Sequence, residues 1–239
     1  MVHPAPPARS PSPVAVGTPS FVASRRDLAV LPLGLAVFWF VHNGPPVDRL
    51  GAVDLRWGLD GPLSSTPWKW LGAFALVALV LLVERRRLAS LLIVRPGAKD
   101  LEWALYGFGA AMTWSWLAGL AFPQDASTGG TGMLVALGVP GVLLLIVTAA
   151  ITEEVAFRGY LAERLGAVLR SRWWGAGLSL AVFVAPHVAF FGPSWLLHHL
   201  GGTLAITVVV LVRRNLVAGM VVHLLVNAPI LIPTVLATI

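Results

Sequence analysis

Long runs of apolar residues, each close to the length that crosses a lipid bilayer, recur along the chain. A transmembrane helix needs about 20 largely apolar residues. Runs that reach or approach this length lie at 28–43, 68–83, 101–122, 132–152, 173–193, 194–212 and 216–238. The pattern predicts an all-α fold, a polytopic transmembrane helix bundle of about seven spans. The first run is short and contains Pro32, so a tilted or re-entrant segment is the alternative there.

Composition agrees with lipid as the main solvent of the chain. Of the 239 residues, 57% are hydrophobic and 12% are charged, against about 45 to 50% and about 25% in globular proteins. A packed globule of this size cannot hide so much apolar surface, which excludes an ordinary soluble domain. The chain has no cysteine, which excludes a disulfide scaffold, a cysteine nucleophile and a thiolate zinc site.

The first 27 residues differ from the rest, because they are rich in Pro, Ser and Ala and show no apolar periodicity. Such a segment is typical of a disordered tail. Arg25 and Arg26 precede an apolar run, as in a signal peptide, but the sequence HNGPP that follows offers no small-residue cleavage site. We expect the run to be retained and the tail to be cytoplasmic.

The net charge of +6 comes from arginines in alternate loops. Cationic clusters precede the first run and follow the second, fourth and sixth, whereas the stretch 43–69 offsets Arg49, Arg56 and Lys69 with three aspartates. The positive-inside rule then predicts a cytoplasmic N-terminus and an external C-terminus in the plasma (inner) membrane. The charge is explained by topology, so we expect membrane lipid and no nucleic acid as a partner.

Polar residues inside the apolar runs are the candidates for function, since an ionisable group there costs on the order of 3 kcal/mol. These exceptions are Glu153, Glu154, Arg158, His187, His198, His199, His223 and Asn227.

The segment TEEVAFRG ends the fourth run. Glu154 and Arg158 lie four residues apart on one helix face, in the favourable order for an ion pair. Glu153 is turned by about 100° from Glu154, so it can face a polar cavity and serve as a general base. The alternative is a solvated helix end whose long side chains reach the interface.

Two further pentapeptides interrupt later runs. In FVAPH, Phe183 lies one turn before His187, and Pro186 is expected to kink the helix. In HLLVN, His223 and Asn227 lie four residues apart, separated by about 6 Å of rise, and could stabilise an oxyanion. Hydrogen bonding between helices is the alternative for both.

Together TEEVAFRG, FVAPH and HLLVN resemble the EExxxR, FxxxH and HxxxN motifs of the CPBP family, which includes the CAAX proteases and bacteriocin-processing or abortive-infection membrane proteins. Residues 132–230 carry the resemblance. It implies an intramembrane endopeptidase with a buried polar active site reached from the cytoplasm. The chain then divides into the tail 1–27, N-terminal transmembrane helices 28–122 and a catalytic membrane core 132–239.

The resemblance also implies roles for individual residues. Glu153 and His187 would activate the attacking water, and His223 and Asn227 would stabilise the oxyanion. Supporting positions would be held by Glu154, Arg158 and Phe183.

Members of this family have been described both as metalloproteases and as glutamate proteases. Glu153, His187 and His223 could supply three zinc ligands and leave an open position for water. However, the chain has no HExxH spacing, and Asn227 suits an oxyanion role. We therefore favour a glutamate mechanism without a cofactor, with zinc as the alternative.

Other function classes stay open. A non-catalytic immunity or scaffold protein could keep the same fold, and a proton or ion transporter could also use intramembrane carboxylates, although no internal repeat is visible. Arg outnumbers Lys 15 to 2, as in proteins from GC-rich bacterial genomes, so a membrane-associated bacterial peptide or protein is the expected substrate. His198 and His199 fall on no motif, and we expect them near the outer interface, with His199 able to pair with Thr203.

Overall fold

Helices make up nearly all of the computed structural model, which describes residues 22–44, 49–123 and 131–237. Its α-helices are α1 (Arg25–Asn43), α2 (Thr66–Ala78), α3 (Ala98–Ala121), α4 (Thr131–Val135), α5 (Gly138–Thr148), α6 (Ala162–Leu169), α7 (Arg172–Phe191), α8 (Ser194–Arg213), α9 (Leu216–Asn227) and α10 (Leu231–Leu236). Shorter helical segments are η1 (Gly61–Leu63), η2 (Leu79–Val83), η3 (Leu88–Leu91), η4 (Ala149–Leu161) and η5 (Ala228–Ile230). A two-residue hairpin pairs β1 (Arg49–Leu50) with β2 (Val53–Asp54).

The described residues confirm an all-α membrane bundle but not the expected number of spans. Five helical segments are long and apolar enough to cross a membrane, namely Gly61–Val83, Gly138–Leu169, Arg172–Phe191, Ser194–Arg213 and Leu216–Leu236. The first predicted span becomes α1, whose apolar part covers only Leu28–Trp39. The third becomes α3, which has 24 residues but begins with Lys99, Asp100 and Glu102 and is too polar to meet the same criterion.

The fourth span extends far beyond its predicted end at residue 152. Helix α5 continues through η4 into α6, so one helical segment runs from Gly138 to Leu169. Glu153 and Glu154 therefore lie in the middle of a membrane helix. Within η4 the backbone is π-helical, a wider helix that is rare and often found at functional sites.

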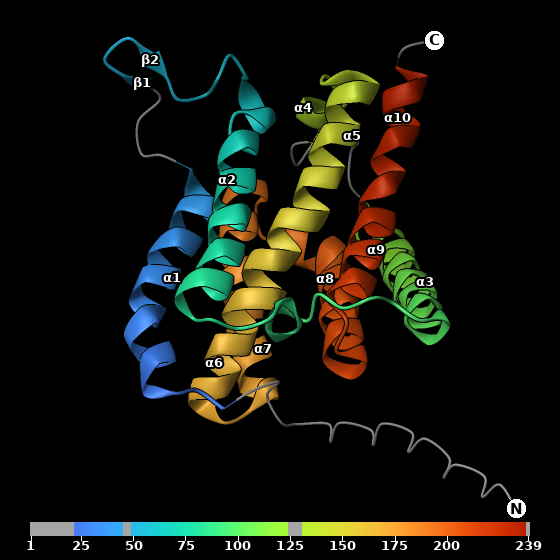
Figure 1. Cartoon of the computed structure of the whole chain (residues 1–239). Helices are drawn as coiled ribbons and strands as arrows, with labels where there is room; N and C mark the ends of the chain where they lie inside the picture. The colour runs from blue at the N-terminus through green and yellow to red at the C-terminus, as the bar shows by residue number, and fades with distance from the viewer. Residues whose placement is uncertain (1–21, 45–48, 124–130, 238–239) are drawn as a thin grey trace, which may run out of the picture.

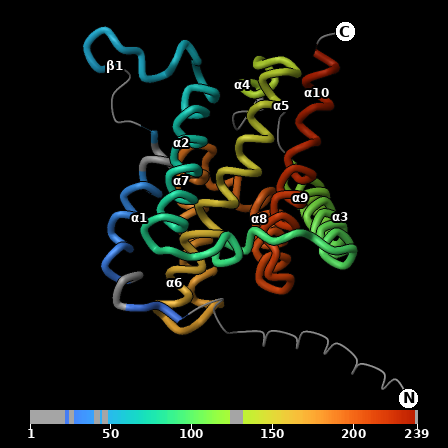
Figure 2. The backbone as a smooth tube through the Cα atoms, in the orientation of Figure 1, coloured from blue at the N-terminus to red at the C-terminus, as the bar shows by residue number. Residues whose placement is uncertain are grey.

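The central position of η4 organises the bundle. It packs against α1, α2, α5, α6, α7 and α9, while α3 lies along α8 (Figures 1 and 2). Helices α6 and α7 approach with their backbones in contact, because a Cβ atom on Gly175 would lie 2.4 Å from the carbonyl oxygen of Ala162. Glycine at this position allows the hairpin to close.

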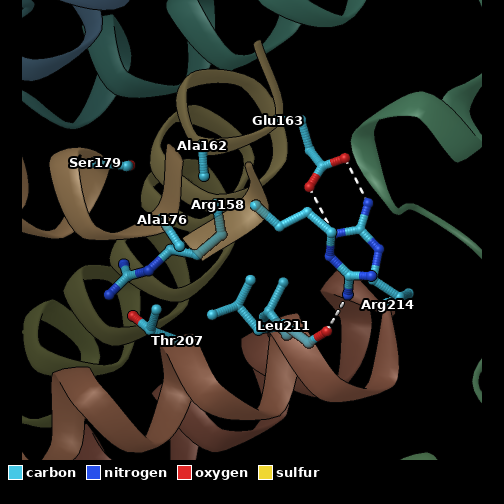
Figure 3. A pocket seen from close by; sticks show the side chains of 10 residues that line it. Arg158, Ala162, Glu163, Ala176, Ser179, Thr207, Leu211 and Arg214 are labelled. Carbon is cyan, nitrogen blue, oxygen red and sulfur yellow. Dashed lines mark hydrogen bonds and ion pairs between the residues drawn. The ribbon is translucent and has the colours of Figure 1, made fainter. Parts of the chain in front are cut away.

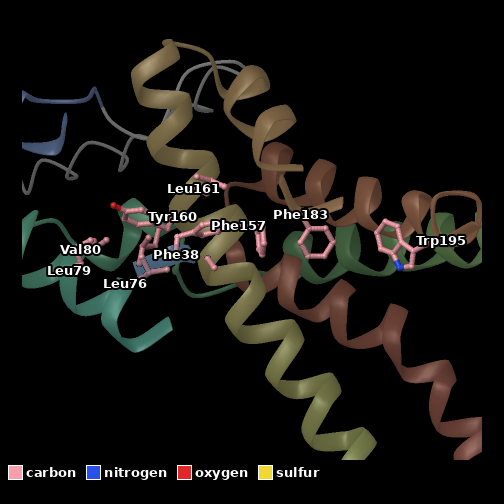
Figure 4. Close-up of a cluster of buried hydrophobic side chains, with 11 residues drawn as sticks. Phe38, Leu76, Leu79, Val80, Phe157, Tyr160, Leu161, Phe183 and Trp195 are labelled. Carbon is pink, nitrogen blue, oxygen red and sulfur yellow. The ribbon is translucent and has the colours of Figure 1, made fainter. Parts of the chain in front are cut away.

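Aromatic rings form the core between η4 and its neighbours (Figure 4). The ring of Phe157 meets Phe38 of α1 and Phe183 of α7 edge to face, with ring centroids 4.9 Å apart in both pairs. Such pairs are worth about 0.5 to 1.5 kcal/mol beyond the area that they bury. The core thus ties the N-terminal helices to the segment that carries the glutamates.

Buried ion pairs join the arginine-rich loops at one end of the bundle. Arg164 of α6 pairs with Glu84 after η2, and Arg214 after α8 makes two hydrogen bonds to Glu163, of 2.6 and 2.5 Å. The loops that follow the second, fourth and sixth predicted spans therefore meet, as alternating helix directions require. Of the predicted tail, residues 1–21 lie outside the described residues, and α1 begins at Arg25 within it.

Asp100 links the start of α3 to the turn between α8 and α9. Its carboxylate accepts hydrogen bonds from the Gly97 N–H (2.8 Å), Arg213 Nε (2.8 Å) and Asn215 Nδ2 (3.2 Å). Burial acts to raise the pKa of Asp100, but these hydrogen bonds and the Arg213 charge outweigh it and lower the pKa below the ordinary value of 3.8.

We expect Asp100→Asn to lower the thermal stability of the detergent-solubilised protein at neutral pH. A carboxyl whose pKa is depressed by folding stabilises the fold above its unfolded pKa, and this contribution is lost as pH falls through the folded value. The difference in melting temperature between parent and variant should therefore shrink below about pH 4. Asp60→Asn, at an exposed position, is the control, and a difference that is constant with pH would contradict the role of the charge.

Candidate active site

Glu154 is fully buried and joins two of the three motifs. Its Oε1 accepts a hydrogen bond from Arg158 Nη1 at 3.0 Å and lies 2.9 Å from His223 Nδ1. The ion pair predicted from the spacing of Glu154 and Arg158 is present, and the helix end predicted as the alternative is not. Because Nδ1 bonds to a carboxylate, the His223 ring is fixed with Nε2 on its opposite side.

A close approach of helices makes this contact possible. Gly219 of α9 faces Glu154, and a Cβ atom there would lie 3.3 Å from Glu154 Oε2 and 2.4 Å from a methyl carbon of Val210. A larger side chain at residue 219 would therefore push α9 away from α8 and crowd Glu154 of η4. Such a shift would lengthen the contact of His223 with the glutamate.

Arg158 is buried between the site and the arginine-rich end of the bundle. Its guanidinium lies 4.4 Å from the centre of the Phe183 ring, within the range of a cation–π interaction. Arg158 also lines a small pocket among α6, α7 and α8 (Figure 3). Phe183 thus supports Arg158 as well as the histidine that follows it.

Glu153 points to a different side of η4 from Glu154, as the helical offset predicted. Its Oε1 lies 2.6 Å from Lys69 Nζ of α2, and its Oε2 lies 4.0 Å from His223 Nε2. His187 acts on the same carboxylate electrostatically. Glu153 and Glu154 therefore face the two nitrogen atoms of one imidazole, and Lys69 covers the outer oxygen of Glu153.

His187 is held by one hydrogen bond and by two aromatic neighbours. Nδ1 lies 2.7 Å from the carbonyl oxygen of Phe183, so this nitrogen carries the proton in the neutral ring and Nε2 is left as an acceptor. The Phe183 ring centre lies 4.4 Å from the imidazole and that of Trp195 lies 4.9 Å away, the latter in a stacked geometry. His187 is thereby oriented before any substrate arrives.

The remaining sequence candidates lie around this centre or away from it. Asn227 ends α9 one turn after His223 and is half-buried. His198 contacts the carbonyl oxygens of Ser194 and Phe122, both at 3.0 Å, and so joins α8 to the end of α3. His199 stacks on Trp195, with ring centroids 5.6 Å apart. The expected pairing of His199 with Thr203 is not found among the hydrogen bonds of the described residues.

Lys69 and Trp195 belong to the site but were not predicted from the sequence. The charge count includes Lys69 in the stretch 43–69, although the predicted span 68–83 also contains it, and in the structure α2 carries it within a candidate span. The available signal was a lysine between two tryptophans, Trp68 and Trp70, at the start of an apolar run. Trp195 could not be found from the sequence pattern, because it lies on α8 and contacts His187 of α7 only through helix packing.

Zinc stays an alternative, although its suggested ligands do not form a metal-binding group in this structure. Among the residues that the structure describes, no group of three His, Asp or Glu side chains lies close enough together to hold a metal ion. The suggested set of Glu153, His187 and His223 is included in that statement. In addition, Glu153 Oε1 accepts a hydrogen bond from the ammonium group of Lys69.

One comparison with known proteins gives a match. Residues 135–229 match the model of the family described as Rce1-like, the type II CAAX prenyl endopeptidases. This segment, called the Rce1-like segment below, is similar to that family. It contains all three motifs, which confirms the resemblance that they predicted, and the family implies CAAX intramembrane endopeptidase activity. Neither the curated proteins nor the solved structures give a match. Lys69 lies outside the Rce1-like segment.

Removal of Arg158 should destabilise the protein, because Glu154 would remain buried without its cation. Breaking a buried ion pair typically costs about 3 to 5 kcal/mol. We expect Arg158→Ala to unfold at a clearly lower temperature in detergent than the parent, and Arg95→Ala, at an exposed arginine, to unfold at nearly the parent temperature. Equal stability of Arg158→Ala and the parent would show that the pair is solvated.

Proposed function

We propose that the protein is an intramembrane endopeptidase that hydrolyses membrane-associated peptides with Glu153 as the general base. One observation supports the proposal. Within the Rce1-like segment, Glu153 and Glu154 lie in the middle of a membrane helix, and both face the ring of His223 on α9. Buried ionisable groups are costly in a membrane and mark functional sites. Here they are grouped rather than scattered.

Water activation is assigned to Glu153 and His187. Glu153 takes a proton from water as the water oxygen attacks the peptide carbonyl carbon. His187, whose Nδ1 is engaged by the Phe183 carbonyl, offers Nε2 to orient the same water. The tetrahedral intermediate then collapses, the C–N bond breaks, and the proton held by Glu153 passes to the leaving amine.

Stabilisation of the oxyanion is assigned to His223 and Asn227. Glu154 holds His223 through Nδ1, so Nε2 is the nitrogen available to the substrate and donates a hydrogen bond when the ring is protonated. The Asn227 amide, one turn further along α9, supplies a second donor. Preorganised donors of this kind stabilise charge as it develops and require no rearrangement during the reaction.

The glutamate mechanism is favoured over zinc because of where the ligands lie. Among the described residues, Glu153, His187 and His223 do not form a group that could hold a metal ion, and the Lys69 ammonium lies against Glu153 Oε1. We therefore propose catalysis without a cofactor. We also propose a bacterial inner membrane as the location, supported by the excess of Arg over Lys, and a lipidated or hydrophobic peptide as the substrate, supported by the similarity to the family.

We expect Glu153→Gln to abolish cleavage of a fluorogenic membrane peptide by the purified protein, because the amide cannot accept a proton from water. His187→Ala should behave similarly. Asn227→Ala should retain some turnover, since loss of one oxyanion donor costs about 100- to 1000-fold. Glu102→Gln, at an exposed glutamate, is the control.

The same preparations separate the alternative functions. Full cleavage by Glu153→Gln would contradict the assignment of the base. If metal analysis finds bound zinc and chelation abolishes cleavage, a zinc mechanism replaces the glutamate mechanism. Absence of cleavage with ion flux in liposomes would favour a transporter, and absence of both would favour a scaffold.

The proposed topology places the arginine-rich end of the bundle in the cytoplasm, with the N-terminus inside and the C-terminus outside. Ion pairs that join Glu84, Glu163 and Asp100 to arginines show that these loops share one end. Reporter fusions to the C-terminus should therefore be active only for a periplasmic reporter. A cytoplasmic signal from that fusion would mean an even number of crossings.

A further inference from the structure

Lys69 is one of only two lysines in the chain, and it contacts the proposed catalytic base. Its side chain is 18% exposed and that of Glu153 is 11% exposed, so the pair is shielded from bulk water. The other lysine, Lys99, is exposed at the start of α3. An intramembrane cation with a single carboxylate partner is a functional feature by default.

The neighbours of Lys69 fix its backbone against the long central helix. Trp70 donates a hydrogen bond from Nε1 to Thr148 Oγ1 at 3.0 Å, one residue before η4 begins. On the other side Trp68 donates from Nε1 to the Leu55 carbonyl at 2.5 Å. With both flanking side chains anchored, α2 presents the Lys69 ammonium to η4 in a defined position.

The type of cation is informative. The described ion pairs at the arginine-rich end use arginine, whose planar guanidinium suits structural pairs with two hydrogen bonds. Lys69 instead provides a compact point charge, and its hydrogen bond is to a single oxygen of Glu153, Oε1. The second oxygen, Oε2, is left facing His223.

We propose that Lys69 is a positioning residue of the active site, which keeps the Glu153 carboxylate ionised and turned so that Oε2 faces His223 and the attacking water. The inference rests on the proposed function. It also implies that α2, outside the Rce1-like segment, completes the site. A buried carboxylate with no cation beside it would otherwise take up a proton and lose its ability to act as a base.

The charged groups around Glu153 define what the lysine contributes. Lys69 of α2 lies 2.6 Å from its Oε1 and His223 of α9 lies 4.0 Å from its Oε2, and His187 of α7 is the third group that interacts with it. Glu154, next to it in η4, is compensated by Arg158. Lys69 is thus the cation in direct contact with the Glu153 carboxylate, whereas His223 Nε2 lies farther away.

The test is the pH dependence of kcat/KM for the parent, Lys69→Met and Lys69→Arg, with Lys99→Met as the matched control. An opposite charge at this distance typically lowers the pKa of a carboxyl group by about 1 to 3. We expect Lys69→Met to move the acidic limb of the profile to higher pH, by about one pH unit or more. Lys69→Arg should restore the parent profile, and Lys99→Met should leave it unchanged. A merely structural role would lower the amount of folded protein without moving the limb.

Infrared difference spectroscopy provides a readout that needs no activity. The protonated C=O band of Glu153, assigned by its loss in Glu153→Gln, should appear at higher pH in Lys69→Met than in the parent. Lys69→Gln replaces Lys69→Met if the latter is not recovered folded. If the parent cleaves no peptide, the proposed function fails, but the infrared titration still decides whether Lys69 controls Glu153.

Two results would overturn the proposal. One is an acidic limb and an infrared titration that do not move in Lys69→Met or Lys69→Gln. The other is higher activity of these variants at every pH, which would mean that Lys69 masks the base instead of preparing it.

Discussion

The burial of a carboxylate, Glu154, at the centre of a membrane bundle is the constraint on which the rest of the structure depends. A charge in this position is strongly unfavourable unless it is paired and hydrogen-bonded. Arg158 lies on the same helix, but His223 comes from α9, so the two helices must be held at one distance and register. The small residue at Gly219 and the aromatic packing of Phe157 and Phe183 serve that requirement.

The ionic contacts of the described chain fall into two groups with different consequences. At the arginine-rich end, Arg164, Arg213 and Arg214 pair with carboxylates from other segments and fasten the loops together. In the centre, Glu153 and Glu154 share a histidine and use two different cations, Lys69 and Arg158. The first group closes the bundle, whereas the second leaves one carboxylate oxygen and one imidazole nitrogen facing each other at 4.0 Å without a hydrogen bond.

Local pattern predicted the features that depend on local geometry. Apolar runs located the helices, and the spacing of four residues gave the Glu154–Arg158 pair, because both depend on neighbours within two turns. Hydropathy alone did not distinguish α3, which is helical but too polar to count as a span, or reveal that the helix of the fourth span continues to Leu169. The ion-pair partner of Glu153 was not predicted, since Lys69 is 84 residues away in sequence and meets it only through tertiary packing.

The asymmetry between the two glutamates follows from this packing. Glu154 has no exposed surface and is bound by two partners through the same oxygen, so it is suited to hold His223 and not to exchange protons. Glu153 retains slight exposure, keeps Oε2 free of hydrogen bonds from the described residues, and faces both histidines. Adjacent residues of one type thus acquire different roles because a helix turns them toward different neighbours. In the proposed mechanism, the first glutamate of the EE pair is the group available to react, and the second is the group that orients the site.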